Sequence, residues 1–382
     1  MPKKHTDGPI AARIARIGDQ FAINGEFQYG EELCNGHINT TYRACYLTED
    51  GIQERYILQR INDYVFKDPV MVMKNVEKVT RHIRWKTMRR RNSVGQPLTL
   101  YPARGGRSYI ILPEEGGMWR CYNNIEGTHT YDVVENTRQA YQAGNAFGAF
   151  QELISDMNPE DIRESIPDFH NTPKRYEALL RSVEADVVGR AANCEAELAM
   201  LKTWSPMFSR LVDMQATGEL PTRITHNDTK INNVMLDEET DEAVCVIDLD
   251  TVMPGLALYD FGDMVRTATC TASEDEEDLS QVVMQLPFFE SLTEGYLDAA
   301  HEFLTQAEIE QLPFAGWLIT TEIGMRFLTD YLDGDKYFRT EKPEHNLIRA
   351  RNQLALARSI QSSLPRMEKF VRRLIKSYRK GK

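Results

Sequence analysis

The sequence lacks any apolar run long enough to cross a membrane. No stretch of about 18 or more apolar residues occurs, and the basic N-terminus is not followed by the apolar segment of a signal peptide. The six cysteines, at positions 34, 45, 121, 194, 245 and 270, include no C-x-x-C pair, which excludes a recognisable zinc motif or disulfide framework. We therefore expect a cytoplasmic protein with reduced thiols.

Positive charge is also scarce. The chain carries 45 Lys and Arg against 57 Asp and Glu, a formal net charge of -12. This charge repels polyanions at long range, so we expect neither nucleic acid nor a membrane as partner. Any bound phosphate group must then be held by local cations. The sequence leaves the oligomeric state open, with a monomer favoured.

The pattern of strands and helices predicts an α+β chain. The 382 residues suffice for two domains or one two-lobed catalytic unit. Three strand-like runs, FAINGEFQYGEEL, TTYRACYL and RYILQRI, are separated by turn-rich segments and predict an antiparallel meander. A helix of about four or five turns is expected from Asp68-Pro69, and further strands follow. After Thr130 the periodicity is helical, except for a hairpin within 222–250. We expect a β-rich lobe over 1–126 and a mainly helical lobe over 127–382.

The segment ITHNDTKINNVML, residues 224–236, contains the frame H-x-D-x-K-x-x-N. These residue types at this spacing are typical of phosphoryl transfer. Asp228 would orient the attacking hydroxyl and accept its proton, and Lys230 would neutralise the moving phosphoryl group. Asn233 would hold magnesium, and His226 is expected to organise the loop by hydrogen bonding.

A second magnesium ligand is expected at the end of a strand. The apolar run AVCVI ends in Asp248, and Asp250 would face the same side if the strand continued. Asp248 is thus the predicted ligand and Asp250 a possible second. The triplet Asp260-Phe261-Gly262 lacks a preceding strand, so we expect Asp260 or Asp263 to cap a helix or support the catalytic loop instead.

These motifs resemble the phosphotransferase family that includes aminoglycoside, choline and homoserine kinases. The resemblance implies a protein-kinase-like fold that binds ATP with Mg²⁺ and phosphorylates a small molecule. Within that family, THNDTKINNVML, CVIDLDTVMPGLALYDFGD and RFLTDYLDGDKYF are most similar to members that phosphorylate the anomeric hydroxyl of N-acetylhexosamines. Only the resemblance supplies the sugar. The alternatives are a kinase of the same fold acting on choline, homoserine or an aminoglycoside, and a catalytically silent nucleotide-binding protein.

The phosphates of ATP have no standard binding motif in this sequence. No Gly-Lys-Ser/Thr occurs, and the first hairpin instead carries Gly36, His37 and Asn39, whose backbone N–H groups could meet phosphates. The family usually has a lysine on the third strand, but none occurs between Lys4 and Lys67.

Gln59 or Arg60, which both lie in the third strand-like run, must therefore take the place of that lysine, or its role is spread over other residues. The two residues face opposite sides of a strand, so only one can point toward the nucleotide. We predict Arg60, with Glu77 as its natural partner. Glu126 is expected beside the adenine.

The acceptor is expected to meet the segment 320–339. This segment offers Glu322, Arg326 and Tyr337, and the resemblance matches Arg326 and Tyr337 to sugar-contacting positions. A helix with ordinary surface ion pairs is the alternative. His170, within DFHNTPKR, is a further candidate, although this segment also reads as a helix start.

Overall fold

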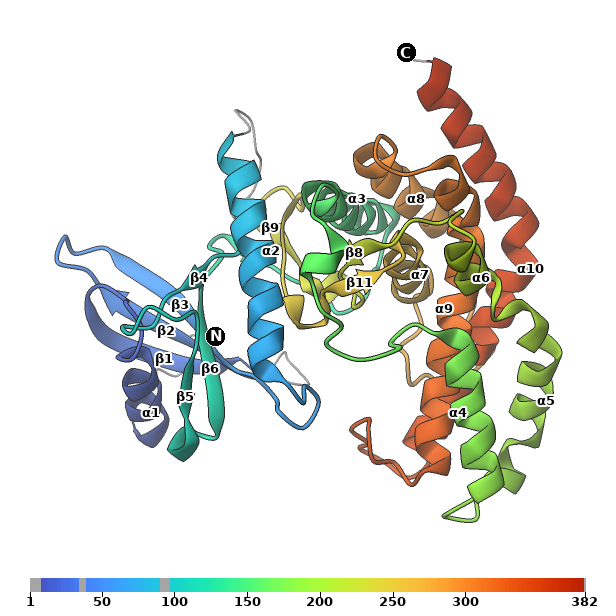
Figure 1. The fold of residues 1–382 in the computed structure, drawn as a ribbon, viewed down its shortest axis with the longest axis horizontal. Coiled ribbons are helices and arrows are strands. Elements are labelled where there is room, and N and C mark those ends of the chain that lie inside the picture. Colours follow the sequence, from blue (N-terminus) through green and yellow to red (C-terminus); the bar gives the residue numbers. More distant parts are fainter. Residues whose placement is uncertain (1–7, 34–38, 90–96, 381–382) are drawn as a thin grey trace. The chain divides into compact units, whose positions relative to one another are not determined.

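The computed structural model describes residues 8–33, 39–89 and 97–380, and the chain forms two compact units (Figure 1). The first unit consists of Met1–Thr128, Arg163–Ile166 and Ile247–Val252. The second consists of His129–Ile162, Pro167–Val246 and Met253–Lys382. Two short segments from later in the sequence therefore pack with the first unit.

The first unit is built on an antiparallel sheet. Its strands follow the order β1-β2-β3-β6-β4, and β5 also pairs with β6. The predicted meander is confirmed, because β1, β2 and β3 are antiparallel neighbours in the sheet. The strands are β1 (Glu26–Leu33), β2 (Thr40–Leu47), β3 (Gln53–Arg60), β4 (Leu100–Tyr101), β5 (Ile110–Leu112) and β6 (Gly117–Asn123).

Two helices accompany this sheet, α1 (Pro9–Gly18) and α2 (Pro69–Arg89). Ile14 of α1 and Trp119 of β6 belong to the same apolar cluster. Side chains alternate along a strand, so Arg120 points to the opposite face, where its Nη1 contacts the sulfur of Met73 on α2. Helix α2 is longer than the four or five turns expected, because the basic residues through Arg89 are good helix formers and continue it.

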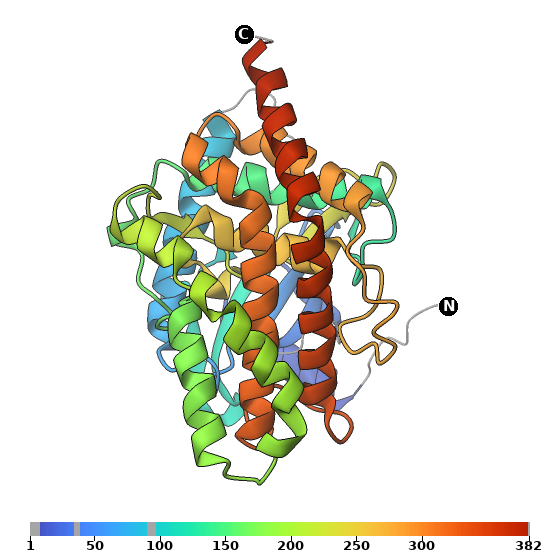
Figure 2. The same ribbon diagram turned by 90° about the vertical axis from the view of Figure 1, so that its right-hand side faces the viewer.

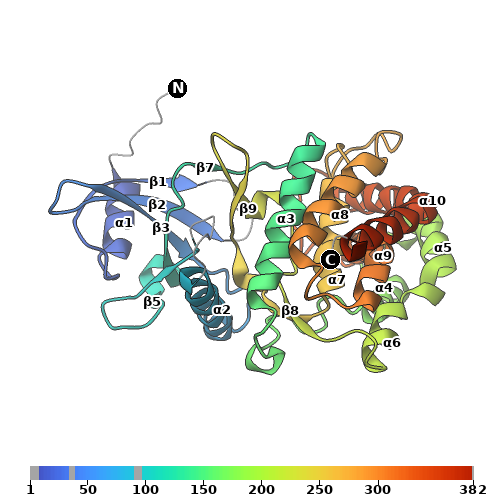
Figure 3. The same cartoon turned by 90° about the horizontal axis from the view of Figure 1, so that it is seen from above.

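The second unit is mainly helical. Helix α3 packs against α8, and α9 lies among α4, α7 and α10 (Figures 2 and 3). Apolar residues surround α9 on nearly all sides, which makes it the centre of the core. The helices are α3 (Thr137–Ile154), α4 (Thr172–Ala185), α5 (Glu195–Trp204), α6 (Arg210–Ala216), α7 (Ala257–Ala268), α8 (Leu286–Ala300), α9 (Gln306–Leu332) and α10 (His345–Lys380).

Short strands frame the central loop of this unit. Strand β8 (Arg223–Thr225) pairs with β11 (Met253–Gly255), and β9 (Val234–Asp237) pairs with β10 (Ala243–Val246). The hairpin predicted within 222–250 is confirmed. The two-residue strand β7 (Thr128–His129) lies where the chain passes between the units. None of the helices in the described part of the chain combines the length and apolar composition needed to cross a bilayer.

Candidate active site

The loop between β8 and β9 carries the frame identified in the sequence. His226 at its start is fully buried, and its ring meets those of Phe147 and Phe150 edge-on at centroid distances of 5.4 and 5.6 Å. Its Nδ1 accepts a hydrogen bond of 3.3 Å from the backbone N–H of Asp228. His226 therefore organises the loop, as expected.

Asp260, in the first turn of α7, supports the same loop from beneath. Its Oδ2 accepts the N–H of His226 at 2.9 Å and the Nε2 of Gln151 at 2.7 Å, and its Oδ1 accepts the N–H of Asn227 at 2.7 Å. Complete burial raises the pKa of Asp260, although these hydrogen bonds oppose the shift. Asn227 has a φ of 65°, a left-handed conformation that these bonds hold in place.

The Asp-Phe-Gly triplet is thus helical and structural. Gly262 faces α9 so closely that a Cβ at this position would lie 2.6 Å from the carbonyl oxygen of Ala315. Asp260 props the catalytic loop, which is one of the roles the sequence suggested.

Asp263, one turn further along α7, fixes the next part of the loop. Its Oδ2 accepts the N–H of Thr229 at 2.9 Å, and its Oδ1 accepts Nε of Arg266 at 2.8 Å. Burial alone would raise the pKa of Asp263, but the adjacent Arg266 charge lowers it below its ordinary value. Arg266 is itself held by Glu274 at 2.6 Å. The loop therefore rests on two buried carboxylates.

Asp228, Lys230 and Asn233 come together on this support. The Asp228 Oδ1 lies 3.2 Å from Nζ of Lys230. The Asn233 Nδ2 donates to the backbone oxygen of Asp228 at 2.8 Å and to its Oδ2 at 3.1 Å. The Asp228 side chain is 26% exposed, so its carboxylate is oriented by neighbours while solvent still reaches it.

Asp248 and Asp250 lie in the first unit and differ from each other in environment. Strand β10 ends at Val246, and Asp248 adopts a φ of 62° before the single turn η6 (Leu249–Thr251). The expectation that the strand continues and that both carboxylates share a face is therefore wrong, because a left-handed residue reverses the chain. Asp248 is half-buried, whereas Asp250 is buried, with one oxygen bonded to Arg120 and the other to Nδ2 of Asn39 at 2.7 Å.

Arg120 is a buried partner of Asp250 that the sequence did not predict. It is fully buried, forms an ion pair with Asp250, and donates to Oε1 of Gln59 from Nε at 3.0 Å and from Nη2 at 2.6 Å. Burial alone would lower the pKa of its guanidinium, but the Asp250 charge raises it above the ordinary value. The available signal was an arginine within the apolar strand MWRCY, where only a partner of opposite charge makes burial tolerable.

Arg60, the predicted replacement for the strand lysine, bonds a backbone oxygen rather than its expected partner Glu77. Its Nη1 donates to the carbonyl oxygen of Gly116 at 3.0 Å. Glu77, its expected partner, accepts instead from the hydroxyl of Ser108 at 3.4 Å. An Arg60–Glu77 ion pair is not among the contacts of the described residues, because β3 directs Arg60 and Gln59 to opposite faces.

The other predicted nucleotide contacts are spread over the first unit. Glu126 is exposed and pairs with Arg55 at 2.6 Å. Asn39 accepts the N–H of Asn62 on its Oδ1 at 3.0 Å while its Nδ2 bonds Asp250. Two further predicted contacts lie outside the described residues, Gly36 and His37.

The predicted acceptor residues cluster in the second unit. Glu322 is completely buried in α9, where Oε1 lies 2.8 Å from Nδ1 of His170 and Oε2 accepts the hydroxyl of Thr172 at 2.6 Å. Burial alone would raise the pKa of Glu322, but His170 and these hydrogen bonds lower it. Arg326, one turn later, lies over the rings of Phe169 at 4.7 Å and Tyr337 at 5.8 Å.

The loop that carries Tyr337 is anchored by Asp330. The Asp330 carboxylate accepts three consecutive backbone N–H groups, those of Lys336, Tyr337 and Phe338, at 2.8 to 2.9 Å. This leaves the Tyr337 ring 48% exposed beside Arg326.

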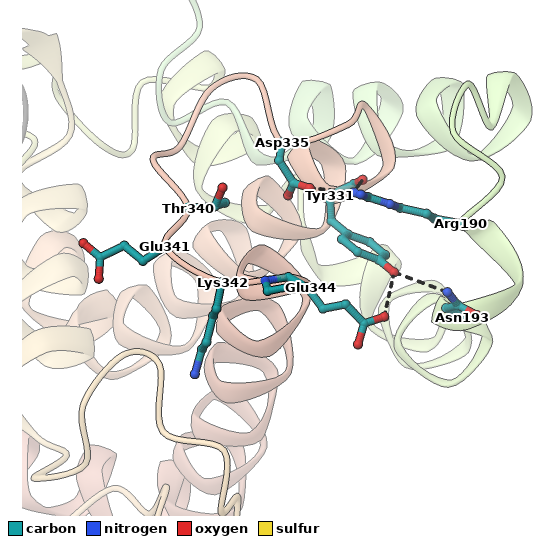
Figure 4. Close-up of a pocket in the computed structure, with 9 residues that line it drawn as sticks. Arg190, Asn193, Tyr331, Asp335, Thr340, Glu341, Lys342 and Glu344 are labelled. Atoms are coloured by element: carbon teal, nitrogen blue, oxygen red, sulfur yellow. Dashed lines mark hydrogen bonds and ion pairs between the residues drawn. The ribbon is translucent and has the colours of Figure 1, made fainter.

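An open hollow of about 590 Å³ lies behind this loop (Figure 4). Its lining side chains bond one another. Arg190 pairs with Asp335 at 2.6 Å, and the Tyr331 hydroxyl meets both Asn193 and Glu344 at 3.3 Å. None of the residues predicted for the site lines it. The hollow therefore belongs to the support of the loop.

Comparison with known structures identifies the class of the fold. An aminoglycoside phosphotransferase from Alicyclobacillus acidocaldarius matches with a TM-score of 0.60 and 11% identity, over 97% of this chain and 98% of that one. The microcompartment-associated aminopropanol kinase matches with a TM-score of 0.55 and 15% identity, over 94% and 98%. The predicted α+β, protein-kinase-like fold is confirmed. Residues 35–290 match the model of the phosphotransferase enzyme family, and the chain belongs to that family.

Proposed function

We propose that the protein is an N-acetylhexosamine 1-kinase, which transfers the terminal phosphoryl group of ATP to the anomeric hydroxyl of N-acetylglucosamine or N-acetylgalactosamine. The observation that carries the proposal is the Asp228 carboxylate, held between Lys230 and Asn233 on a loop that two buried aspartates support. This is the arrangement that phosphoryl transfer to an alcohol requires.

Asp228 orients the acceptor hydroxyl and takes its proton as the bond to phosphorus forms. Its partial exposure lets an acceptor reach it, and the Lys230 ammonium, 3.2 Å away, stabilises charge on the transferred group. His226, buried behind the loop, holds the backbone of Asp228 in place.

Asn233 in the second unit and Asp248 in the first are each proposed, on the sequence, as magnesium ligands. Asn233 uses its amide nitrogen to bond Asp228, so its amide oxygen is the atom that would meet a metal. No group of three or more His, Cys, Asp and Glu side chains in residues 8–33, 39–89 and 97–380 could hold a metal alone. Mg²⁺ takes most of its ligands from phosphates and water, so it needs few protein ligands. When bound, the ion supplies positive charge to the phosphates of ATP.

The contacts to ATP are proposed on the sequence. Backbone groups of the hairpin at Gly36, His37 and Asn39 would meet the phosphates, and Arg60 and Glu126 would lie along the nucleotide. Asp250 is proposed as an additional metal ligand only if it exchanges the protein partners that now occupy its oxygens.

The charges around Arg326 favour a neutral acceptor. Glu322 is bonded to His170 and Thr172, whereas Arg175 and Arg326 contribute two positive charges. Burial and, to a smaller extent, the neighbouring Arg326 charge lower the pKa of Arg175. A positively charged acceptor such as choline or an aminoglycoside would add to this repulsion.

A sugar suits the same surroundings. Phe169 and Tyr337 offer aromatic faces, and the Nε2 of His170 is buried with no hydrogen-bond partner in the described residues.

The test is ATP consumption against a panel of N-acetylhexosamines, unmodified sugars, choline, homoserine and an aminoglycoside, followed by phosphorus NMR of the product. We expect turnover with N-acetylhexosamines and a phosphate on the anomeric carbon. Preferential turnover of an amine would refute the acceptor assignment, and nucleotide binding without turnover of any acceptor would indicate a silent binding protein.

Asp228→Asn should lower kcat by about 10²- to 10⁴-fold with little change in ATP affinity, because only the general base is lost. Asp213→Asn, at an exposed position on α6, is the matched control and should leave kcat unchanged. An Asp228→Asn variant with wild-type turnover would remove Asp228 as the base.

A further inference from the structure

Arg120 carries a positive charge at a fully buried position, where the free-energy cost of removing water from a charged group is large. Its side chain is fully buried, and it touches Gln59, Asp250, the sulfur of Met73 and the ring of Tyr122. Transferring a guanidinium from water to such a place costs free energy that an ion pair only partly returns. An apolar pair of similar size would often serve stability equally well, so stability alone does not account for the Arg120–Asp250 pair.

The pair instead connects several elements of the first unit at one point. Gln59 lies directly opposite Arg120 across β3 and β6, and its side-chain oxygen receives two of the guanidinium's hydrogen bonds. Asp250 receives another, and its second oxygen is held by Asn39 just before β2. Nδ2 of Asn75 on α2 donates to the carbonyl oxygen of Val252, the residue after η6, at 3.2 Å. Strands β2, β3 and β6 and helix α2 thus all hold one short turn.

That turn carries Asp248. Its left-handed φ of 62° is unfavourable for a residue with a side chain, and such conformations persist only where the surroundings impose them. Asp250 lies two residues further and is anchored on both oxygens, whereas Asp248 remains half-buried. The buried Asp250 carboxylate therefore holds the turn on which Asp248, the proposed metal ligand, lies.

We infer that Arg120 is a positioning residue of the nucleotide–metal site, which clamps Asp250 and thereby fixes Asp248 in the conformation that binds the metal ion of a metal–nucleotide complex. The inference rests on the proposed function for the identity of that ligand. The inference assigns a role to Arg120, the one fully buried arginine of the described sheet. In this role Arg120 acts through Asp250 and does not touch the ligand.

The decisive comparison is between Arg120→Gln and the double variant Arg120→Gln/Asp250→Asn. The single change leaves a buried carboxylate without its cation and should lower both the melting temperature and metal–nucleotide affinity. The double change removes both charges, so the melting temperature should recover most of its loss. If Arg120 positions Asp248, the affinity should be at least tenfold weaker than in the wild type in Arg120→Gln, which keeps the Asp250 carboxylate, and it should not recover in the double variant.

The readout is binding of Mn²⁺ in the presence of a non-hydrolysable ATP analogue, followed by electron paramagnetic resonance. It requires neither an acceptor nor turnover, so it is independent of the kinase assay that tests the proposed function. Arg120→Lys, which keeps the charge but not the forked geometry, should fall between the wild type and the single variant. Arg13→Gln, which breaks the ion pair to Glu115 elsewhere in this unit, should lower the melting temperature and leave Mn²⁺ affinity unchanged.

Recovery of both stability and Mn²⁺ affinity in the double variant would overturn the inference, since the pair would then be structural only. A wild-type protein that binds no Mn²⁺ with the analogue would also overturn it. Turnover failing while Mn²⁺ binding behaves as expected would refute the kinase assignment and leave the role of Arg120 intact.

Discussion

Replacing Asp260 with asparagine tests whether the catalytic loop depends on the carboxylate beneath it. Asp260 accepts three hydrogen bonds of 2.7 to 2.9 Å through two oxygens, and two of its donors are the backbone amides of His226 and Asn227. Asparagine has one acceptor oxygen. In its best orientation that oxygen replaces Oδ2 and keeps two bonds, while the new NH₂ group faces the N–H of Asn227.

The expected cost follows from these contacts. Loss of a hydrogen bond to a charged acceptor costs about 1.5–3 kcal/mol, and the buried donor left without an acceptor adds about 1–3 kcal/mol. Removing the buried charge returns part of this, since burial raises the pKa of Asp260 and so disfavours its ionised form. We expect Asp260→Asn to lower the free energy of unfolding by about 2–4 kcal/mol. The conformation at Asn227, with φ at 65°, should relax first.

Urea unfolding measures the loss of stability in Asp260→Asn, amide hydrogen exchange measures the protection of the loop, and kinase assays measure kcat. The amides of His226 and Asn227 should lose protection, and kcat should fall by about tenfold or more because Asp228 is held less often in its active position. Asp213→Asn, at an exposed position, should change the free energy of unfolding by no more than about 0.5 kcal/mol. Unchanged protection of both loop amides in Asp260→Asn would refute the reasoning.

Two further predictions concern stability. The pKa of Glu322 is lowered in the folded protein, so its ionised form contributes stability above its unfolded pKa of about 4.3, and this contribution disappears as the pH falls through the folded value. Glu322→Gln should therefore be less stable by about 1–3 kcal/mol at pH 7 and show a shallower loss of stability below about pH 4, measured by urea midpoints; equal slopes would contradict this. Gly262→Ala should cost about 1–3 kcal/mol, because its Cβ would lie 2.6 Å from the Ala315 oxygen, whereas Gly105→Ala, with open space around it, should be nearly neutral in thermal unfolding. Equal melting temperatures for the two alanine variants would argue against close packing at Gly262.

Several features of the fold and the site could be predicted from the sequence, because they depend on residues that are close together in the chain. The strand meander follows from alternation and turn residues, and the β9–β10 hairpin from two short apolar runs around a polar turn. The frame of Asp228, Lys230 and Asn233 spans six residues, so a single loop conformation suffices to bring these side chains together. The length of α2 was underestimated, because helix ends are less well specified than helix centres.

Contacts between distant residues could not be read in the same way. Arg120 and Asp250 are separated by 130 positions, and His170 and Glu322 by 152. Nothing in either local sequence announces the partner, because the pairing depends on which faces of strands and helices pack together. The same cause explains why Arg60 and Glu77 have other partners, since the strand face of Arg60 is set by the register of β3 against β6.

The family chemistry could be read from the order of residues, since a catalytic loop is a short segment whose residue types and spacing carry the reaction. Which charges support that loop, and which support the turn of Asp248, depended on how distant parts of the chain pack together. Buried ion pairs form where packing removes water, and the free energy of that removal depends on every element that surrounds the pair rather than on the order of residues along the chain.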